Sequence, residues 1–213
     1  KNIILISEKN NSQLYLLSKK LNLFYVEHNK FIGGRYSVLS EVGIVPAYLM
    51  GLDIVKLRSN ILECLNKKNQ RIMKLNSTKL ANLMSSRMFS SLVFLNYSPK
   101  LEKFLYWCQQ LIAESLGKKA KGIFPIISEM PKDNHSIMQL FLDGKKNNIF
   151  TFFDSREKNS TKIKTNRLLE EFSFLSKKNI NLIKSAQKNA TKRVFAKKNF
   201  PFRSFEIDIK NET

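Results

Sequence analysis

Short apolar runs recur along the chain, and stretches with helical spacing separate them. "IILIS" at 3–7, "SLVFLNYS" at 91–98 and "NIFTFFD" at 148–154 each have the length and the Ile, Val and Phe content of a buried strand. Amphipathic stretches at 12–22 and 99–116 follow the first two runs. Strand, helix and strand in this order predict a parallel sheet covered by helices. We therefore expect an α/β fold, a three-layer α-β-α sandwich with a mainly parallel sheet.

Weaker signals predict the remaining elements. Extended segments are expected at 23–28, 122–128 and 205–209, and helices at 38–49, 53–90, 133–143 and 180–194. Asp133 is expected to cap the helix that it begins, because aspartate side chains accept hydrogen bonds from the first free amides of a helix. The composition changes at Gly51, which predicts a domain boundary between 1–50 and 51–213.

Composition indicates a globular protein, since 43% of the residues are hydrophobic and 11% are aromatic. No apolar run approaches the length of about 18 residues that a membrane-spanning helix needs. Cys64 and Cys108 fit neither a disulfide framework nor a metal site, so we expect reduced thiols. These observations predict a soluble, cytoplasmic protein without a membrane partner.

The net charge of +20 leaves two interpretations open. A basic excess of this size is compatible with binding to nucleic acid. It is also explained by lysines scattered along the chain, and only 156–203 is denser, with 14 Lys and Arg against 3 Asp and Glu. There Ile180, Ile183, Ala186, Ala190 and Val194 recur at helical steps, so the lysines are expected to form the solvated face of a helix. We favour this second interpretation and expect no specific nucleic-acid partner.

An adjacent glycine pair stands out in "FIGGRYSVLS", because the whole chain has only 7 glycines. Gly33 and Gly34 permit positive φ angles and close approach of the backbone to a ligand. They precede Arg35, whose guanidinium is suited to an anionic group. This segment is therefore a candidate binding site.

Two further segments carry polar residues that the core does not explain. Gln110 and Glu114 lie one turn apart beside the apolar stripe of the helix at 99–116. His135 stands where a loop meets a helix, and imidazole titrates near neutral pH, as an acid–base group must. The aspartates show no metal-ligand spacing with either histidine, so no metal site is expected.

Three blocks in this order, "GGRYSVLSEVG", "QQLIAESLGKKAKG" and "DNHSIMQLFLDG", resemble the motifs of the glucose-6-phosphate isomerase family. The resemblance runs through most of the chain. It implies a flavodoxin-like sugar-isomerase fold, incomplete at both ends, with the end of the small domain at 1–50 and most of the large domain at 51–213. It also implies interconversion of glucose 6-phosphate and fructose 6-phosphate in glycolysis and gluconeogenesis.

The resemblance also implies a role for each site residue. Glu114 is expected to move the proton between C2 and C1 of the open sugar, Arg35 to stabilise the enediolate, and His135 to assist ring opening. In this family that histidine comes from the neighbouring subunit, so a homodimer is expected. Gln110 and Gly34 are expected to bind the sugar-phosphate substrate, and no metal or organic cofactor is implied.

The chain departs from the family in three features. The phosphate-binding loop of the family is expected before the first residue, and a C-terminal lysine is expected after Thr213. Asn134 stands where the family usually has Gln. Two alternatives stay open: a non-catalytic sugar-phosphate-binding protein on the same fold, and a basic nucleic-acid-binding module whose affinity falls steeply with salt.

Overall fold

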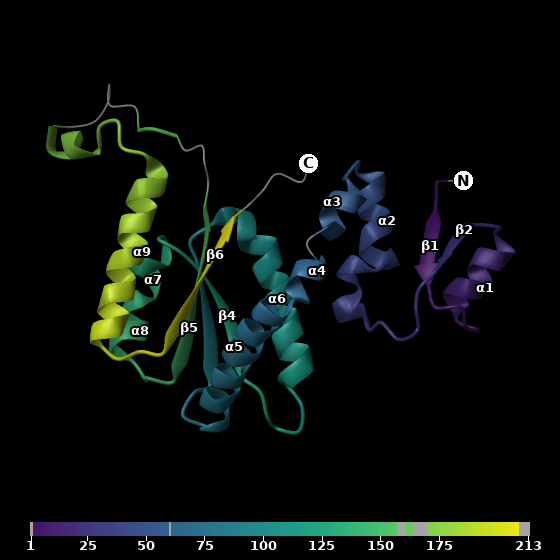
Figure 1. Ribbon diagram of the computed structural model, residues 1–213, viewed down its shortest axis with the longest axis horizontal. Coiled ribbons are helices and arrows are strands. Elements are labelled where there is room, and N and C mark those ends of the chain that lie inside the picture. Colours follow the sequence, from purple (N-terminus) through teal and green to yellow (C-terminus); the bar gives the residue numbers. More distant parts are fainter. Residues whose placement is uncertain (1, 60, 157–160, 164–169, 209–213) are drawn as a thin grey trace. The chain divides into compact units, whose positions relative to one another are not determined.

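The computed structural model describes residues 2–59, 61–156, 161–163 and 170–208 (Figure 1). Over these residues the chain forms two compact units, of which the first ends at Leu75 and the second begins at Asn76. The division falls within helix α5 (Lys67–Ser85), later than the composition change at Gly51. Helices α3 and α4 are therefore part of the first unit. In the described ranges, no helix combines the length and the apolar character needed to cross a membrane.

The first unit begins with the predicted strand–helix–strand arrangement. Strands β1 and β2 pair in parallel, with Ile4 opposite Phe24, and α1 connects them. The Ser12 hydroxyl caps α1 by accepting a hydrogen bond from the amide of Tyr15 at 3.3 Å. The elements of this unit, in chain order, are β1 (Ile4–Ser7), α1 (Gln13–Lys20), β2 (Phe24–Glu27), η1 (Gly34–Leu39), α2 (Glu41–Leu49), α3 (Ile54–Ser59), α4 (Ile61–Cys64) and the start of α5.

The helix expected from residue 38 begins later. A 3₁₀ turn, η1, comes first, and α2 starts only at Glu41 because Ser40 has an extended backbone. Hydroxyls stabilise this turn: Ser37 donates to the carbonyl of Gly34 at 2.7 Å, and Ser40 donates to that of Ser37 at 2.8 Å. Such local bonds compete with a regular helix start. Pro46 lies inside α2 without ending it.

The second unit confirms the predicted fold class. Its four strands are all parallel, in the order β4-β3-β5-β6. Helices α5 and α6 cover one face of this sheet, and α7, α8 and α9 cover the other (Figure 1). The elements are the end of α5, β3 (Ser91–Asn96), η2 (Pro99–Leu101), α6 (Glu102–Leu116), β4 (Phe124–Glu129), α7 (Asp133–Ser136), α8 (Met138–Asp143), β5 (Asn148–Arg156), η3 (Glu170–Leu175), α9 (Ile180–Lys197) and β6 (Phe202–Asp208).

Strand β3 is buried on both faces, which explains its unbroken apolar sequence. Val93 and Leu95 belong to one core cluster with Phe150 and Phe195, whereas Leu92 and its neighbours face the other cluster under α5 and α6. The predicted apolar stripe of α6 packs into this second cluster. Strand β6 lies at the edge of the sheet, and its exposure follows the predicted alternation only in part: Ile207 packs against the core under α5 and α6, whereas Phe205 is 36% exposed. The predicted Ile209 lies outside the described residues.

The single helix predicted for 133–143 is divided, and the role predicted for Asp133 is wrong. Helix α7 ends at Ser136, and α8 begins at Met138. Asp133 is not the N-cap but the first residue of α7, and its carboxylate turns back to the end of β4. The carboxylate binds the end of β4 because two hydrogen-bond donors are available there.

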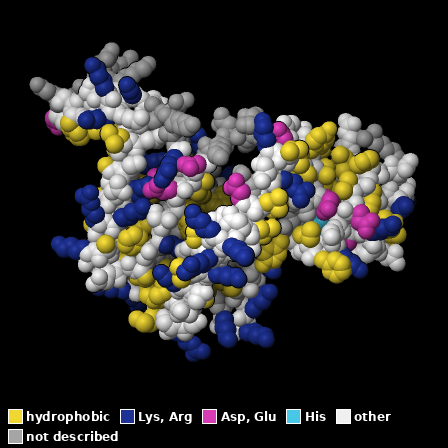
Figure 2. All heavy atoms as spheres, viewed as in Figure 1, with side chains coloured by type: hydrophobic (Ala, Val, Ile, Leu, Met, Phe, Trp, Pro, Cys, Tyr) yellow, Lys and Arg dark blue, Asp and Glu magenta, His cyan; other side chains and the backbone are white. Residues whose placement is uncertain are grey.

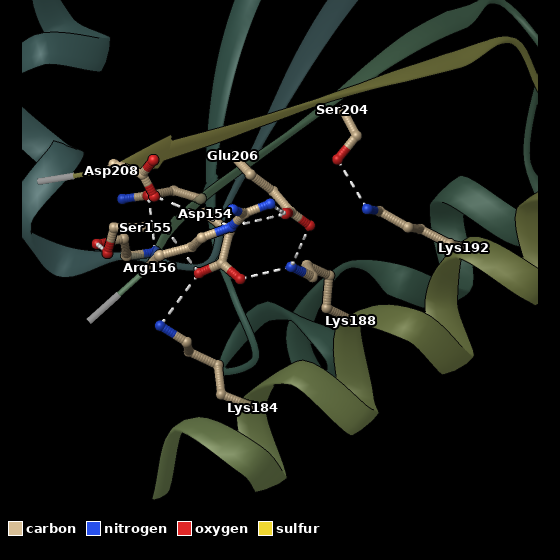
Figure 3. A network of polar contacts seen from close by, with 11 residues as sticks. Asp154, Ser155, Arg156, Lys184, Lys188, Lys192, Ser204, Glu206 and Asp208 are labelled. Atoms are coloured by element: carbon tan, nitrogen blue, oxygen red, sulfur yellow. Dashed lines mark hydrogen bonds and ion pairs between the residues drawn. The ribbon is translucent and has the colours of Figure 1, made fainter. Parts of the chain in front are cut away.

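The orientation of α9 contradicts the predicted solvated lysine face. Ile180 and Val194 are 48% and 40% exposed, whereas Lys188 is 5% exposed and faces the sheet. Figure 3 shows Lys184, Lys188 and Lys192 pointing from α9 toward the strands. The apolar spacing in this helix therefore marks its outer side.

Carboxylates on the strands explain the inward lysines. The buried Asp154, on β5, accepts from the ammonium groups of Lys184 at 3.1 Å and Lys188 at 2.6 Å. Lys188 also reaches Glu206 on β6 at 3.3 Å, and Arg156 donates to the same carboxylate at 3.1 Å. The hydrogen bond from Arg156, with that from Lys188, lowers the pKa of Glu206. These ion pairs hold α9 on the edge of the sheet.

Replacing Asp154 by Asn is expected to destabilise the second unit by about 3 kcal/mol, because removing one partner of a buried ion pair leaves uncompensated charges. Urea denaturation measures the loss. The matched control is Asp143→Asn, which breaks an exposed pair with Lys198 (3.0 Å) and should leave the midpoint almost unchanged. Equal urea midpoints for the two variants would contradict a stabilising role of the buried ion pairs between α9 and the sheet.

Candidate active site

Gln110 and Glu114 lie together near the end of α6. The side-chain amide of Gln110 donates to the Glu114 carboxylate at 3.0 Å, and both side chains are exposed. The neighbouring Gln109 points the other way and donates to the carbonyl of Pro125 on β4 at 2.8 Å. This bond and the apolar stripe fix the rotation of α6, so Gln110 and Glu114 project away from the core.

His135 lies on the single turn of α7, beyond the end of β4. Its side chain is exposed, and in the described part of the chain the imidazole makes no hydrogen bond. Ile137 and Met138, directly after α7, pack against the core under α9. The adjacent Asn134 has a buried side-chain oxygen for which the described residues offer no hydrogen-bond donor.

One copy of the second unit does not bring Glu114 and His135 together. Helix α6 runs back from the carboxyl end of β3 to the start of β4, so Glu114 lies near the amino edge of the sheet. His135 follows the carboxyl end of β4, a six-residue strand that spans roughly 20 Å. The two helices also cover opposite faces (Figure 1). Glu114 and His135 are therefore separated by the sheet itself.

Gly34 and Arg35 belong to the first unit, where they begin η1. The glycine pair does not use the positive φ angles that glycine permits: Gly33 has φ −66° and ψ 149°, and among the described glycines only Gly51 and Gly122 have positive φ. The pair instead leaves space, because a Cβ added at Gly34 would meet no atom within 4 Å. The Arg35 guanidinium lies 5.5 Å from the centre of the Tyr36 ring.

No sequence pattern singled out His28, which supports the loop that carries the glycine pair. Its ring nitrogens bond to the carbonyl of Ile32 at 2.9 Å and to the Glu41 carboxylate at 3.1 Å. Hydrogen bonds to the carbonyl of Ile32 and to the Glu41 carboxylate raise the pKa of His28. The pKa of Glu41 is lowered by hydrogen bonds from the backbone amide of Glu41 itself and from His28. The contact between His28 and Glu41 thereby joins the segment that precedes the glycine loop to the first residue of α2.

A hollow of about 300 Å³ opens beside Asp154 and Lys188, at the carboxyl end of β5. None of the site residues predicted from the sequence lines it. The charged side chains that line this hollow already pair with one another, so we assign the hollow to the ion-pair network between α9 and the sheet (Figure 3). Among the residues that the structure describes, no three His, Cys, Asp or Glu side chains are grouped to hold a metal ion.

The chain is similar in sequence to proteins named glucose-6-phosphate isomerase. It is 33% identical to one from Methanocaldococcus jannaschii, over 90% of this chain and 48% of the relative. It is 30% identical to one from Campylobacter jejuni, over 98% of this chain and 52% of the relative. The chain thus spans about half the length of these curated relatives. No protein-family model matches it.

Solved structures share the fold. A hypothetical protein from Thermus thermophilus matches 96% of this chain and 51% of its own length, with a TM-score of 0.82 and 25% identity. A glucose-6-phosphate isomerase from Chlamydia trachomatis matches 96% of this chain and 43% of its own length, with a TM-score of 0.55 and 16% identity, which shows the fold alone.

Two glycine substitutions test the loop geometry. Gly34→Ala is expected to leave stability unchanged, because the added methyl group enters open space. Gly43→Ala is expected to destabilise the first unit by about 2 kcal/mol, because its Cβ would collide with the carbonyl oxygen of Val38. Thermal melting of the two variants measures the difference. A larger loss in Gly34→Ala than in Gly43→Ala would refute this description of the loop.

Proposed function

We propose that this chain, which is related to glucose-6-phosphate isomerases over nearly its whole length, is part of an enzyme that interconverts glucose 6-phosphate and fructose 6-phosphate. The observation that carries the proposal is the Gln110–Glu114 pair. It supplies an oriented carboxylate on a helix that is anchored to the sheet. We also propose that the enzyme acts in the cytoplasm, in glycolysis and gluconeogenesis.

Glu114 is the general base in this proposal. Its carboxylate removes the proton from C2 of the open-chain aldose phosphate and returns it to C1 of the enediolate. Gln110 donates to that carboxylate and can also contact the substrate, which restricts where the base points.

Arg35 stabilises the negative charge that develops on the enediolate oxygens. A guanidinium has five donors in a fixed plane, and donors aimed at developing charge are among the largest contributions to catalysis. Gly34 lets the sugar phosphate approach, because no side chain occupies the space in front of its backbone. The serines of η1 hold this turn in place before substrate arrives.

His135 transfers a proton to the ring oxygen during ring opening, and it does so in the site of a second copy. The sheet separates Glu114 from His135 within one copy, which favours a homodimer in which each site takes its histidine from the partner. The exposed imidazole and the unsatisfied oxygen of Asn134 agree with this, since an interface can supply the missing donor.

Two other functions fit these observations less well. A sugar-phosphate-binding protein without catalysis needs no oriented base at position 114. For nucleic-acid binding we would expect an unbroken basic surface, but on the viewed face of the second unit Lys and Arg are interspersed with hydrophobic and uncharged side chains (Figure 2), and Lys188 is buried in ion pairs.

Glu114→Gln is expected to lower kcat by about a thousandfold, because it removes the base while keeping the shape of the side chain. Conversion of fructose 6-phosphate to glucose 6-phosphate, read through a coupled dehydrogenase, measures the loss in the protein from the complete reading frame. Glu102→Gln, on the first turn of the same helix, is the matched control and should retain full activity. Undiminished turnover in Glu114→Gln would exclude this base.

A further inference from the structure

The turn that carries His135 is too short to hold its own shape. Helix α7 has four residues, and an isolated helix of that length is unstable in water. The direction in which the imidazole projects must therefore be set by contacts between this turn and the rest of the unit. On the C-terminal side, Ile137 and Met138 pack against the core.

Asp133 provides the contact on the N-terminal side. One oxygen of its carboxylate, Oδ2, accepts from the hydroxyl of Ser128 at 3.0 Å and from the amide of Glu129 at 2.7 Å. Both donors belong to the end of β4, and Ser128 is fully buried. Hydrogen bonds to an ionised acceptor are about twice as strong as neutral ones. The carboxylate thus fastens the first residue of α7 to a rigid strand.

We infer that Asp133 is a positioning residue for His135. It lies two residues before the histidine, and the backbone between them is held by bonds from the amides of Asn134 and His135 to Pro131 and Lys132. The end of β4 is held in turn, because the amide of Met130 donates to the carbonyl of Asn96 on the central strand. A continuous set of hydrogen bonds therefore connects the sheet to the histidine.

This inference rests on the proposed function, since it assigns Asp133 to the reaction through His135. Displacing an acid–base group by about 1 Å can cost on the order of a hundredfold in rate. We therefore expect Asp133→Ala to lower kcat by between about tenfold and about a hundredfold with little change in KM. Asp133→Asn keeps an acceptor oxygen for Ser128 and Glu129 and is expected to restore most of the activity.

A double-mutant cycle with His135→Ala is the decisive experiment, performed on the protein from the complete reading frame in its native assembly. If Asp133 acts through His135, the double variant is no slower than His135→Ala alone. Additive losses, or failure of Asp133→Asn to recover activity while it folds normally by circular dichroism, would overturn the inference. Asp143→Ala, an exposed acidic residue at the end of α8, is the control and should keep wild-type kcat.

The outcomes separate this inference from the proposed function. A wild-type protein that does not isomerise the sugar phosphates removes both, because there is then no histidine role to position. An active wild type with an additive cycle removes only the role of Asp133. An active wild type with a non-additive cycle and recovery in Asp133→Asn supports both.

Discussion

The parallel arrangement of the four-stranded sheet is the constraint on which the rest of the second unit depends. Every strand points the same way, so each connection must cross back over a face of the sheet, and the ends of the helices alternate between its two edges. The end of α6 is thereby fixed at the amino edge on one face, and the turn of α7 at the carboxyl edge on the other. Glu114 on the first and His135 on the second belong to different surfaces of one unit. The proposed active site, which uses both, therefore takes them from two copies.

The local geometry orients each part of the proposed site independently. Gln109 and the apolar stripe orient α6, so the Gln110–Glu114 pair exists without substrate. On the other edge, the contact of Asp133 with β4 holds a turn that has no stability of its own. In the first unit, the serine hydroxyls of η1 and the ion pair between His28 and Glu41 hold the loop of Arg35. Preorganisation of this kind reduces the entropy that binding must otherwise overcome.

The sequence predicted the strands, the parallel sheet and α6 because these depend on periodicity and chain order. The predictions were wrong or missing where a side chain pairs with a residue from another element of the fold. By its spacing in the sequence, Lys188 lies on the polar face of α9. That face turns toward the sheet because Lys188 forms ion pairs there with Asp154 and Glu206. The sequence pattern predicted Asp133 as an N-cap, yet its carboxylate accepts from two donors at the end of β4. The contact between His28 and Glu41 depends on the path of the loop between them, which the sequence pattern does not predict. The motif residues themselves were found by resemblance, and their spacing alone would not have distinguished them from solvated helix residues.

Complementation between two inactive variants tests the shared site most directly. Glu114→Gln and His135→Ala are purified separately, mixed, dissociated and reassociated, and assayed for isomerisation of fructose 6-phosphate. In a mixed dimer, one site combines the intact Glu114 of one copy with the intact His135 of the other. We predict that activity returns on mixing, to about a quarter of the wild-type value at equal amounts. Mixed dimers that form but stay as inactive as either parent would contradict a site built from two copies.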